Sequence, residues 1–421
     1  MIDKNLFLYD LAVLAILKDE GHYLKEWLDY HLAAGVDHFY LYDNESSDNQ
    51  AEVAKPYVEA GLVDYFPTPG KVMQYAVYND AVKKFKFFCR YMAFIDGDEF
   101  IYPRNTTGGD NIVKIVDEVL SHDKNAASLA INWQCFGSNG QEKADYSRNV
   151  LERFTYRAPR NWVGSAHVGN HHVKSIVNPR KTSFFNNPHY ALYFEGCSAY
   201  NEIGRVVQGP FNNPVTADKI VINHYYTKSW EEYFRRKDRP LATGGKVNDI
   251  KMYFDAYNHN EEFDDGILKY FAERKKTYNP SQNSPDVESL SRALIKNLLP
   301  VLLPDTPSDF YADKLETFLT CRALSSYFGT KFNNDKVANF FEELSIKAIL
   351  KSLTNLSLAD KRLLVRELPN LLKLPYPAVQ ELRAVSLQII QQMMDELRTI
   401  GGYNGWKDYV ELDYMRDFLK E

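Results

Sequence analysis

Residues 92–101 read Met-Ala-Phe-Ile-Asp-Gly-Asp-Glu-Phe-Ile, an apolar run that ends in two aspartates separated by one glycine. Residues i and i+2 of a strand face the same side, roughly 6–7 Å apart, so Asp96 and Asp98 are placed to share one hydrated divalent cation. Oxygen ligands suit Mg²⁺ or Mn²⁺, which keep water and phosphate oxygens in their other coordination positions. We therefore predict a Mg²⁺ or Mn²⁺ site that binds a nucleotide diphosphate. The alternative is a solvated acidic turn.

Composition narrows the functional classes. The chain has 421 residues, enough for two domains or for one large domain with an appendage. A net charge of -6 argues against a general nucleic-acid-binding protein. No charge-free apolar run reaches membrane-spanning length, so we expect a cytoplasmic protein with at most peripheral contact with the inner membrane. The four cysteines form no C-x-x-C pair, so the sequence predicts neither a zinc site nor a disulfide framework. They are Cys89, Cys135, Cys197 and Cys321.

Short apolar strands alternate with helical segments in the N-terminal third, a pattern typical of an α/β domain. Ligands of open parallel sheets bind beyond the carboxyl ends of the strands. Lys18, Asp43 and Asp96 all lie at such ends, so we expect them to border one crevice. The expected strands are 11–17, 39–42, 62–66 and one that ends at Asp96, and the expected helices are 23–34 and about 72–87.

The rest of the chain changes character twice. Residues 126–226 show more strand and loop patterns, and residues 230–237 return to helical spacing. A polar, proline-bearing stretch at 279–285 is the predicted linker. We place an α/β domain at residues 1–275 and an α-helical domain at 276–421, which could support a homo-oligomer. The expected strands are 128–136, 151–156, 173–177 and 219–226, and the expected C-terminal helices are 312–327, 337–353, 359–372 and 377–399.

Other polar groups follow strands directly. The carboxylate of Asp43 and the amide of Asn44 could contact a ribose or a base edge, and an Asx turn is the alternative. His224 ends an apolar run, and Lys228 follows four residues later. A neutral imidazole could complete the metal coordination while the ammonium neutralises a phosphate, although a backbone-bonded histidine and a solvated lysine fit the same spacing. Lys174 suits either a phosphate clamp or a solvated face.

Several stretches, taken together and in order over about residues 11 to 237, resemble a known family. The chain resembles a GT-A-fold glycosyltransferase of the family 92 type, formerly a domain of unknown function, and is similar to the family-2-like bacterial enzymes. The resemblance implies a Rossmann-like nucleotide-diphospho-sugar transferase domain and does not cover the C-terminal helices. The matching stretches are residues 14–49, 74–85, 92–101, 132–140, 172–179 and 223–237.

The resemblance also implies roles for individual residues. Asp96 and Asp98 match the family's Asp-X-Asp motif, which implies Mn²⁺ or Mg²⁺ bound with the donor diphosphate. The middle residue here is Gly97, where relatives often carry a branched apolar side chain. The implied nucleotide-sugar contacts are Asp43, Asp96, Lys174 and Lys228, to which the strand-end positions add Lys18 and Asn44. The implied metal ligands are Asp96, Asp98 and His224.

The implied reaction is metal-dependent transfer of a hexose from a nucleotide-diphosphate sugar, a UDP-sugar first of all, to a saccharide or glycolipid acceptor. The resemblance suggests inversion and a role in surface polysaccharide or lipopolysaccharide synthesis. An inverting transferase needs a carboxylate to take the proton from the acceptor hydroxyl. Glu142 and Glu195 are the candidates. A metal-dependent nucleotidyltransferase or phosphohydrolase and a non-catalytic sugar-binding protein are the rival interpretations.

Overall fold

The computed structural model describes residues 7, 9–86, 88–104, 110–165, 168–236 and 249–278, together with short helical pieces between residues 325 and 395. The chain divides into two compact units, residues 1–286 and 287–421. The predicted linker lies outside the described residues, as do most of the predicted C-terminal helices, and the few described residues of the second unit are helical. The following account concerns the first unit.

Strands and helices alternate through the first part of this unit, as the apolar runs predicted. The helix predicted from residue 23 begins at Gly21 and ends where Gly35 takes a φ of +102°. This part comprises β1 (Tyr9–Leu17), α1 (Gly21–Ala33), β2 (His38–Asp43), α2 (Gln50–Glu59), β3 (Val63–Pro67), α3 (Gln74–Phe85), β4 (Cys89–Phe94), β5 (Glu99–Pro103), α4 (Ile112–Leu120) and β6 (Ala126–Cys135).

The second part is built from short strands and ends in helices. Its last helix, α8 (Gly266–Thr277), extends past residue 275, where the sequence placed the end of the first domain. The other elements are α5 (Val150–Arg153), β7 (Tyr156–Arg157), β8 (Val163–Ser165), β9 (Val168–Gly169), β10 (Val173–Val177), η2 (Pro179–Lys181), β11 (Thr182–Phe185), β12 (Ala191–Tyr193), β13 (Ser198–Tyr200), β14 (Val206–Val207), β15 (Ile220–His224), α6 (Trp230–Arg235), α7 (Ile250–Tyr257) and β16 (Glu262–Phe263).

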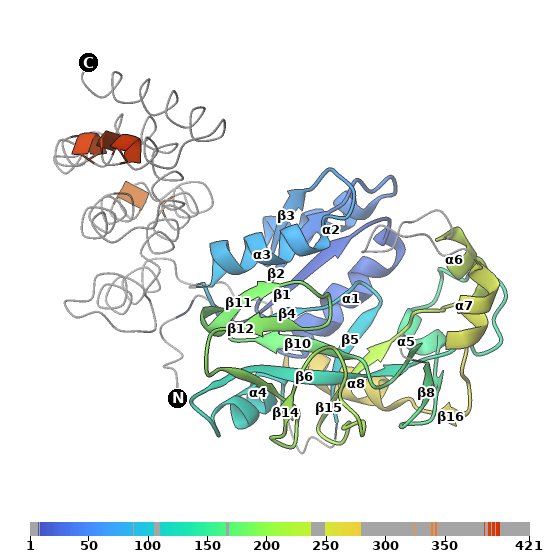
Figure 1. Cartoon of the computed structure of the whole chain (residues 1–421). Helices are drawn as coiled ribbons and strands as arrows, with labels where there is room; N and C mark the ends of the chain where they lie inside the picture. Colours follow the sequence, from blue (N-terminus) through green and yellow to red (C-terminus); the bar gives the residue numbers. More distant parts are fainter. Residues whose placement is uncertain are drawn as a thin grey trace. The chain divides into compact units, whose positions relative to one another are not determined.

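One mixed sheet organises the unit. Its strands follow the order β14-β13-β6-β10-β4-β1-β2-β3, and Figure 1 shows β3, β2, β1, β4, β10 and β6 lying side by side. Strands β4, β1, β2 and β3 are parallel, whereas β10 runs antiparallel between β4 and β6. β15 pairs with both β5 and β6 and so joins the acidic motif to the sheet. The predicted α/β class is confirmed.

A single large core holds the sheet and its helices together. It includes Leu11 and Val13 of β1, Trp27 and Leu28 of α1, and Phe39 of β2, all inaccessible to solvent. Parallel strands buried on both faces read as continuous apolar runs, which is why β1 was recognisable from sequence. None of the helices formed by the described residues combines the length and the apolar character that crossing a lipid bilayer requires.

The strand expected at residues 151–156 is wrong. Residues 150–153 form the short helix α5, and only Tyr156–Arg157 is a strand. The carboxylate of Glu26, on α1, accepts the backbone N–H groups of Val150 and Leu151 at 2.7 and 3.2 Å. Because a side chain distant in sequence satisfies the free N–H groups at the start of this turn, part of a stretch predicted as a strand becomes a helix.

His31 joins α1 to β5 inside the core. Its Nδ1 lies 2.8 Å from the carbonyl oxygen of Trp27, and its Nε2 accepts the backbone N–H of Ile101 at 3.2 Å. The ring is inaccessible to solvent. Burial lowers the pKa of His31 from 6.5 to about 3, because the charged form has no water around it. The folded protein therefore keeps this imidazole neutral where an unfolded chain would protonate it.

We expect the stability of this protein to fall in mild acid through His31. Below its unfolded pKa of 6.5 the unfolded chain binds a proton that the folded chain refuses until about pH 3, so protonation favours unfolding across that window. The contribution is about 1.4 kcal/mol per pH unit. Urea unfolding of the wild type and of His31→Gln between about pH 6 and pH 4 measures it. Equal pH slopes for the two proteins would contradict the assignment.

Candidate active site

The acidic motif forms a turn between two strands. β4 ends at Phe94 and β5 begins at Glu99, with Asp96 and Asp98 in the connection. The backbone N–H of Glu99 donates to the carbonyl of Asp96 over 3.1 Å, and that of Asp96 donates to Oε2 of Glu99 over 2.8 Å. The expectation that the two aspartates share one face of a strand is therefore wrong. Each carboxylate has its own partners.

Gly97 makes room for this turn. A Cβ at this position would lie 2.9 Å from Cδ2 of Leu17 and 3.3 Å from Cγ of Glu20. A branched side chain would therefore collide with the end of β1. Glycine here lets the side chain of Glu20 lie against the peptide that joins the two aspartates.

Asp96 forms an ion pair with a buried lysine, Lys174. Nζ of Lys174 lies 2.8 Å from Oδ2 of Asp96 and 3.4 Å from Oε2 of Glu99, and the lysine side chain is 1% exposed. The indole N–H of Trp133 donates to Oε1 of Glu99 over 2.7 Å. Burial raises the pKa of Glu99, and Lys174 opposes that effect. The structure thus places Lys174, predicted as a nucleotide contact, as an internal counter-ion of the acidic turn.

Asp98 faces a histidine and an arginine. His224 pairs in register with Glu99, because β15 lies beside β5, and its Nε2 is 3.6 Å from Oδ1 of Asp98. Nη1 of Arg236 is 3.1 Å from Oδ2. Burial would raise the pKa of Asp98, but Arg236 and His224 hold it well below its usual range. Asp98 is therefore a buried carboxylate that stays ionised.

Asp98 and His224 are suited to a divalent cation. Nδ1 of His224 is buried without a hydrogen-bond partner in the described structure. No hydrogen bond at that atom therefore holds the imidazole ring away from a metal. A carboxylate oxygen facing an imidazole nitrogen is an acceptable donor pair for Mn²⁺ or Mg²⁺. Across the described residues, no three His, Cys, Asp or Glu side chains are grouped to hold a metal. Water and ligand oxygens would therefore complete the coordination.

A cavity of about 380 Å³ opens beside this pair, within the size range of small-molecule sites. The end of β1, the acidic turn, β6 and β15 form its walls. It is lined by Ile16, Leu17, Lys18, Glu20, Gln74, Asp96, Gly97, Asp98, Trp133, Pro188, His189, His224, Tyr226, Tyr233, Arg236 and Ile250. We call it the metal-side cavity. Its walls combine apolar and aromatic surface with converging charged groups.

A second cavity of about 380 Å³ adjoins the first and shares Lys18, Glu20 and Arg236 with it. We call it the α1-side cavity, because the loop before α1 and the start of that helix form one wall. Its remaining lining residues are Asp19, His22, Tyr23, Asp48, Tyr146, Thr227, Lys228, Glu232 and Arg235.

Three nucleotide contacts were predicted at the ends of β1 and β2, and of these Lys18 lines the cavities, whereas Asp43 and Asn44 do not. Lys18 lines both cavities while its Nζ donates to the carbonyls of Asn44 and Glu45, each at 3.0 Å. The side-chain amide of Asn44 donates to the carbonyls of Thr68 and Gly70, and Oδ1 of Asp43 accepts the N–H of Ser46 at 2.9 Å. Neither Asp43 nor Asn44 belongs to the lining of these two cavities, and both stabilise loops at the crevice edge.

Lys228 lines the α1-side cavity and is buried. Its Nζ lies 4.4 Å from the ring centre of Tyr23, and no described residue forms a hydrogen bond or ion pair with it. Burial lowers the pKa of Lys228. Its φ is +51°, a left-handed conformation that is rare outside glycine. A buried cation without a direct ion-pair partner among the described residues, held in a rare backbone conformation, fits the predicted contact with an anionic ligand.

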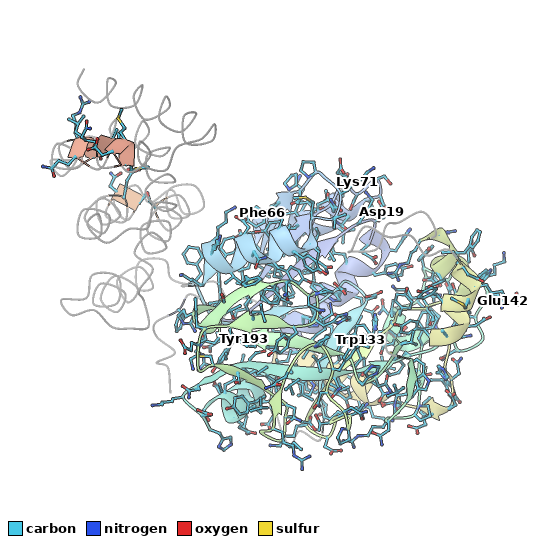
Figure 2. The ribbon with its side chains drawn as sticks, in the orientation of Figure 1. Asp19, Phe66, Lys71, Trp133, Glu142 and Tyr193 are labelled. Carbon is cyan, nitrogen blue, oxygen red and sulfur yellow. The ribbon has the colours of Figure 1, made fainter. Side chains whose placement is uncertain are left out.

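The two carboxylates predicted to act as the base lie elsewhere. Glu142 and Glu195 are exposed, and neither belongs to the lining of the metal-side or the α1-side cavity. Figure 2 shows Glu142 at the periphery, well apart from Trp133 in the interior. Their positions after a glycine-rich loop and a His-Tyr pair suggested proximity, but the chain leads both side chains out to solvent. The structure gives neither a place beside the reacting groups.

Sequence reasoning missed most of the residues that line the metal-side cavity, among them Glu20, Gln74, His189 and Arg236. Gln74 donates to Oδ1 of Asp96 at 3.3 Å. The ring of His189 lies 5.0 Å from that of Trp133. Glu20 and Arg236 fall within stretches that matched the family, which was a usable signal. His189 had none.

The unit is an α/β fold with a mixed sheet, in which an acidic turn and a histidine lie together at the ends of neighbouring strands. This arrangement is typical of GT-A-fold glycosyltransferases, the class that the sequence predicted. Residues 14–265 match glycosyltransferase family 92, and the chain belongs to this family.

Individual relatives show how far the match extends. A family 92 glycosyltransferase of Ricinus communis is 26% identical over 240 residues, which cover 56% of this chain and 38% of that protein. A galactan β-1,4-galactosyltransferase of Arabidopsis thaliana is 22% identical over 213 residues, 48% of this chain and 39% of that protein. This chain thus spans less than half the length of either. The crystal structure of residues 1–349 of TarS from S. aureus, in complex with UDP, aligns over 80% of this chain and 88% of that one, with 11% identity and a TM-score of 0.30.

Proposed function

We propose that this protein is a metal-dependent hexosyltransferase that uses a nucleotide-diphosphate sugar, a UDP-sugar, as its donor. The observation that carries the proposal is the buried, ionised Asp98 facing His224 at the wall of the metal-side cavity. Family membership supports glycosyl transfer. A Mn²⁺ or Mg²⁺ ion held by Asp98 and His224 would offset the charge of the departing diphosphate.

The chain's own residues supply the rest of the chemistry. Lys18, Lys228 and Arg236 border the junction of the two cavities and bring positive charge to a diphosphate bound there. In a single inverting displacement, the acceptor oxygen bonds to the anomeric carbon as the diphosphate leaves with the bonding electrons. A carboxylate takes the hydroxyl proton. Glu20 is our candidate, because it lines both cavities and lies against the acidic turn.

We expect Glu20→Gln to lower hexose transfer about a hundredfold, because the amide cannot accept the acceptor's proton. Metal-dependent nucleotide affinity should change little, since the substitution leaves Asp98 and His224 in place. Product formation measures the first quantity and calorimetric titration with UDP the second. Glu142→Gln and Glu195→Gln make the same chemical change at exposed positions and should stay close to the wild-type rate. A larger loss in either of them would move the base outside the cavities.

The donor sugar and the acceptor are proposed from a relative. The name of the Arabidopsis galactan β-1,4-galactosyltransferase supports galactose as the hexose and a saccharide as the acceptor. We therefore propose UDP-galactose as the first donor to test. We further propose a role in surface polysaccharide or lipopolysaccharide synthesis, with the enzyme in the cytoplasm or peripherally on the inner membrane.

Nucleotide release from a panel of UDP- and GDP-sugars, with Mn²⁺ and with EDTA, tests the proposed function. We expect Mn²⁺-dependent release of UDP from one sugar, and faster release when an acceptor is added. Release of pyrophosphate or inorganic phosphate would indicate a nucleotidyltransferase or a phosphohydrolase. Binding of a sugar without any release would indicate a non-catalytic protein.

A further inference from the structure

Arg236 occupies the carboxylate that the proposed metal would need. It follows α6 directly and lies 138 positions from Asp98 in the chain. Its Nη1 lies 3.1 Å from Oδ2 of Asp98 and donates to the carbonyl of Tyr226 at 3.1 Å. The guanidinium carbon lies 5.2 Å from the centre of the Tyr226 ring. Among the described residues, Asp98 is the one carboxylate with which Arg236 forms an ion pair.

Asp98 needs this cation when no metal is bound. Its side chain is 7% exposed, and a buried carboxylate is costly unless a positive group lies close to it. The neighbouring lysine, Lys174, is committed to Asp96 and Glu99. Arg236 is therefore the main group that balances the charge of Asp98 within the described structure, ahead of His224 and Lys228.

A divalent cation and the guanidinium of Arg236 would repel each other if both bound the carboxylate of Asp98. A cation between Asp98 and His224 would place two positive charges within a few ångströms of the guanidinium, and like charges at that distance repel strongly in a site shielded from water. The side chain of Arg236 can move away from Asp98, because it is 29% exposed and lines both cavities. The contacts that remain to it, a backbone carbonyl and an aromatic ring, are uncharged.

We propose that Arg236 is an exchangeable counter-ion, which neutralises Asp98 until a divalent cation binds and then pairs with the diphosphate of the donor. The proposal rests on the metal-dependent function proposed above. It makes the metal and the nucleotide bind cooperatively, because the nucleotide offers Arg236 a new anionic partner at the moment when the metal takes the old one. The metal alone must compete with Arg236 and so binds weakly.

Mn²⁺ affinity, measured by electron paramagnetic resonance with and without UDP, tests the exchange. For the wild type we expect UDP to tighten Mn²⁺ binding by about tenfold or more. Arg236→Gln removes the competitor, so we expect it to bind Mn²⁺ without UDP about fivefold more tightly than the wild type. The tightening by UDP should shrink correspondingly in this variant, because the diphosphate no longer gains an arginine.

Two further variants make the test specific. Arg160→Gln removes an arginine that pairs with Asp218 and lines neither cavity, and should leave Mn²⁺ affinity unchanged. Arg236→Lys keeps the positive charge beside Asp98 and should restore the wild-type affinity, even if the glutamine variant proves too unstable to study. Thermal unfolding in EDTA confirms that each variant is folded.

Several outcomes would overturn the proposal. Wild-type or weaker Mn²⁺ binding by Arg236→Gln without UDP would show that Arg236 does not compete with the metal. Binding by Arg236→Lys as tight as that expected of the glutamine variant would show that charge is not the cause. If the wild type binds no Mn²⁺ even with UDP, the metal-dependent function itself fails, and that result is distinct from either of the others.

Discussion

Asp98→Asn should reduce metal-dependent release of the nucleotide by about three orders of magnitude, the largest loss of activity that we expect from any single substitution in this chain. Asparagine keeps the shape of the side chain but removes the charge that a cation and Arg236 both require. The pKa of Asp98 lies well below its usual range, so the wild-type carboxylate stays charged at neutral pH. Nucleotide release from the preferred donor, with Mn²⁺ and with EDTA, measures the effect.

A matched surface variant controls for the loss of an arginine-aspartate pair. Asp218 is 66% exposed, pairs with Arg160 at 2.6 Å and lines neither cavity. Asp218→Asn should therefore leave nucleotide release unchanged, since exposed pairs contribute little. Substantial metal-dependent release by Asp98→Asn, in a variant shown to be folded by circular dichroism, would remove Asp98 from the metal site.

Lys174→Met should have the largest effect on stability, a loss of about 3–5 kcal/mol in the free energy of unfolding. Lys174 is the buried counter-ion of both Asp96 and Glu99, and methionine replaces its length without its charge. Removing the ammonium leaves two carboxylates close together in a site with little water. Burial already acts against the charge of Glu99 by raising the pKa of that carboxyl, and Lys174 is the group that opposes this effect.

Urea denaturation at neutral pH measures this loss. Lys25→Met is the matched control, because Lys25 is 71% exposed and pairs with Asp29 on the surface of α1. We expect at most about 1 kcal/mol from that change. In the double variant Lys174→Met with Glu99→Gln, the second substitution should recover part of the stability by removing one uncompensated carboxylate. If Lys174→Met were as stable as Lys25→Met, the counter-ion role would be wrong.

Local pattern was enough for the parts of the fold whose residues are buried on both faces. β1 and β10 fall where their apolar runs predicted them, because a strand in the middle of a sheet has little choice of composition. Residues 150–153 are the counter-example. The sequence predicts a strand at 151–156, but the carboxylate of Glu26 stabilises a helix there by accepting the N–H groups of Val150 and Leu151 from 124 and 125 positions away.

The sequence by itself determined the family, the α/β class and the identity of the site's main groups. Asp98 and His224 were predicted together as metal ligands from the family resemblance, whereas the spacing of His224 alone also fitted a backbone-bonded histidine. Such information is local, since it depends on which residues follow one another and on the period of the buried positions.

Only the tertiary structure decided which charges meet. Lys174 and Lys228 looked equivalent in sequence, yet Lys174 lies beneath Asp96 and Glu99, while Lys228 lies unpaired at a cavity wall. Arg236 reaches Asp98 from a distant helix end, and Glu142 is directed into solvent. The physical reason is that an ion pair depends on separation in space and on exclusion of water. Both are set by how the strands and helices pack, which no local stretch of sequence contains.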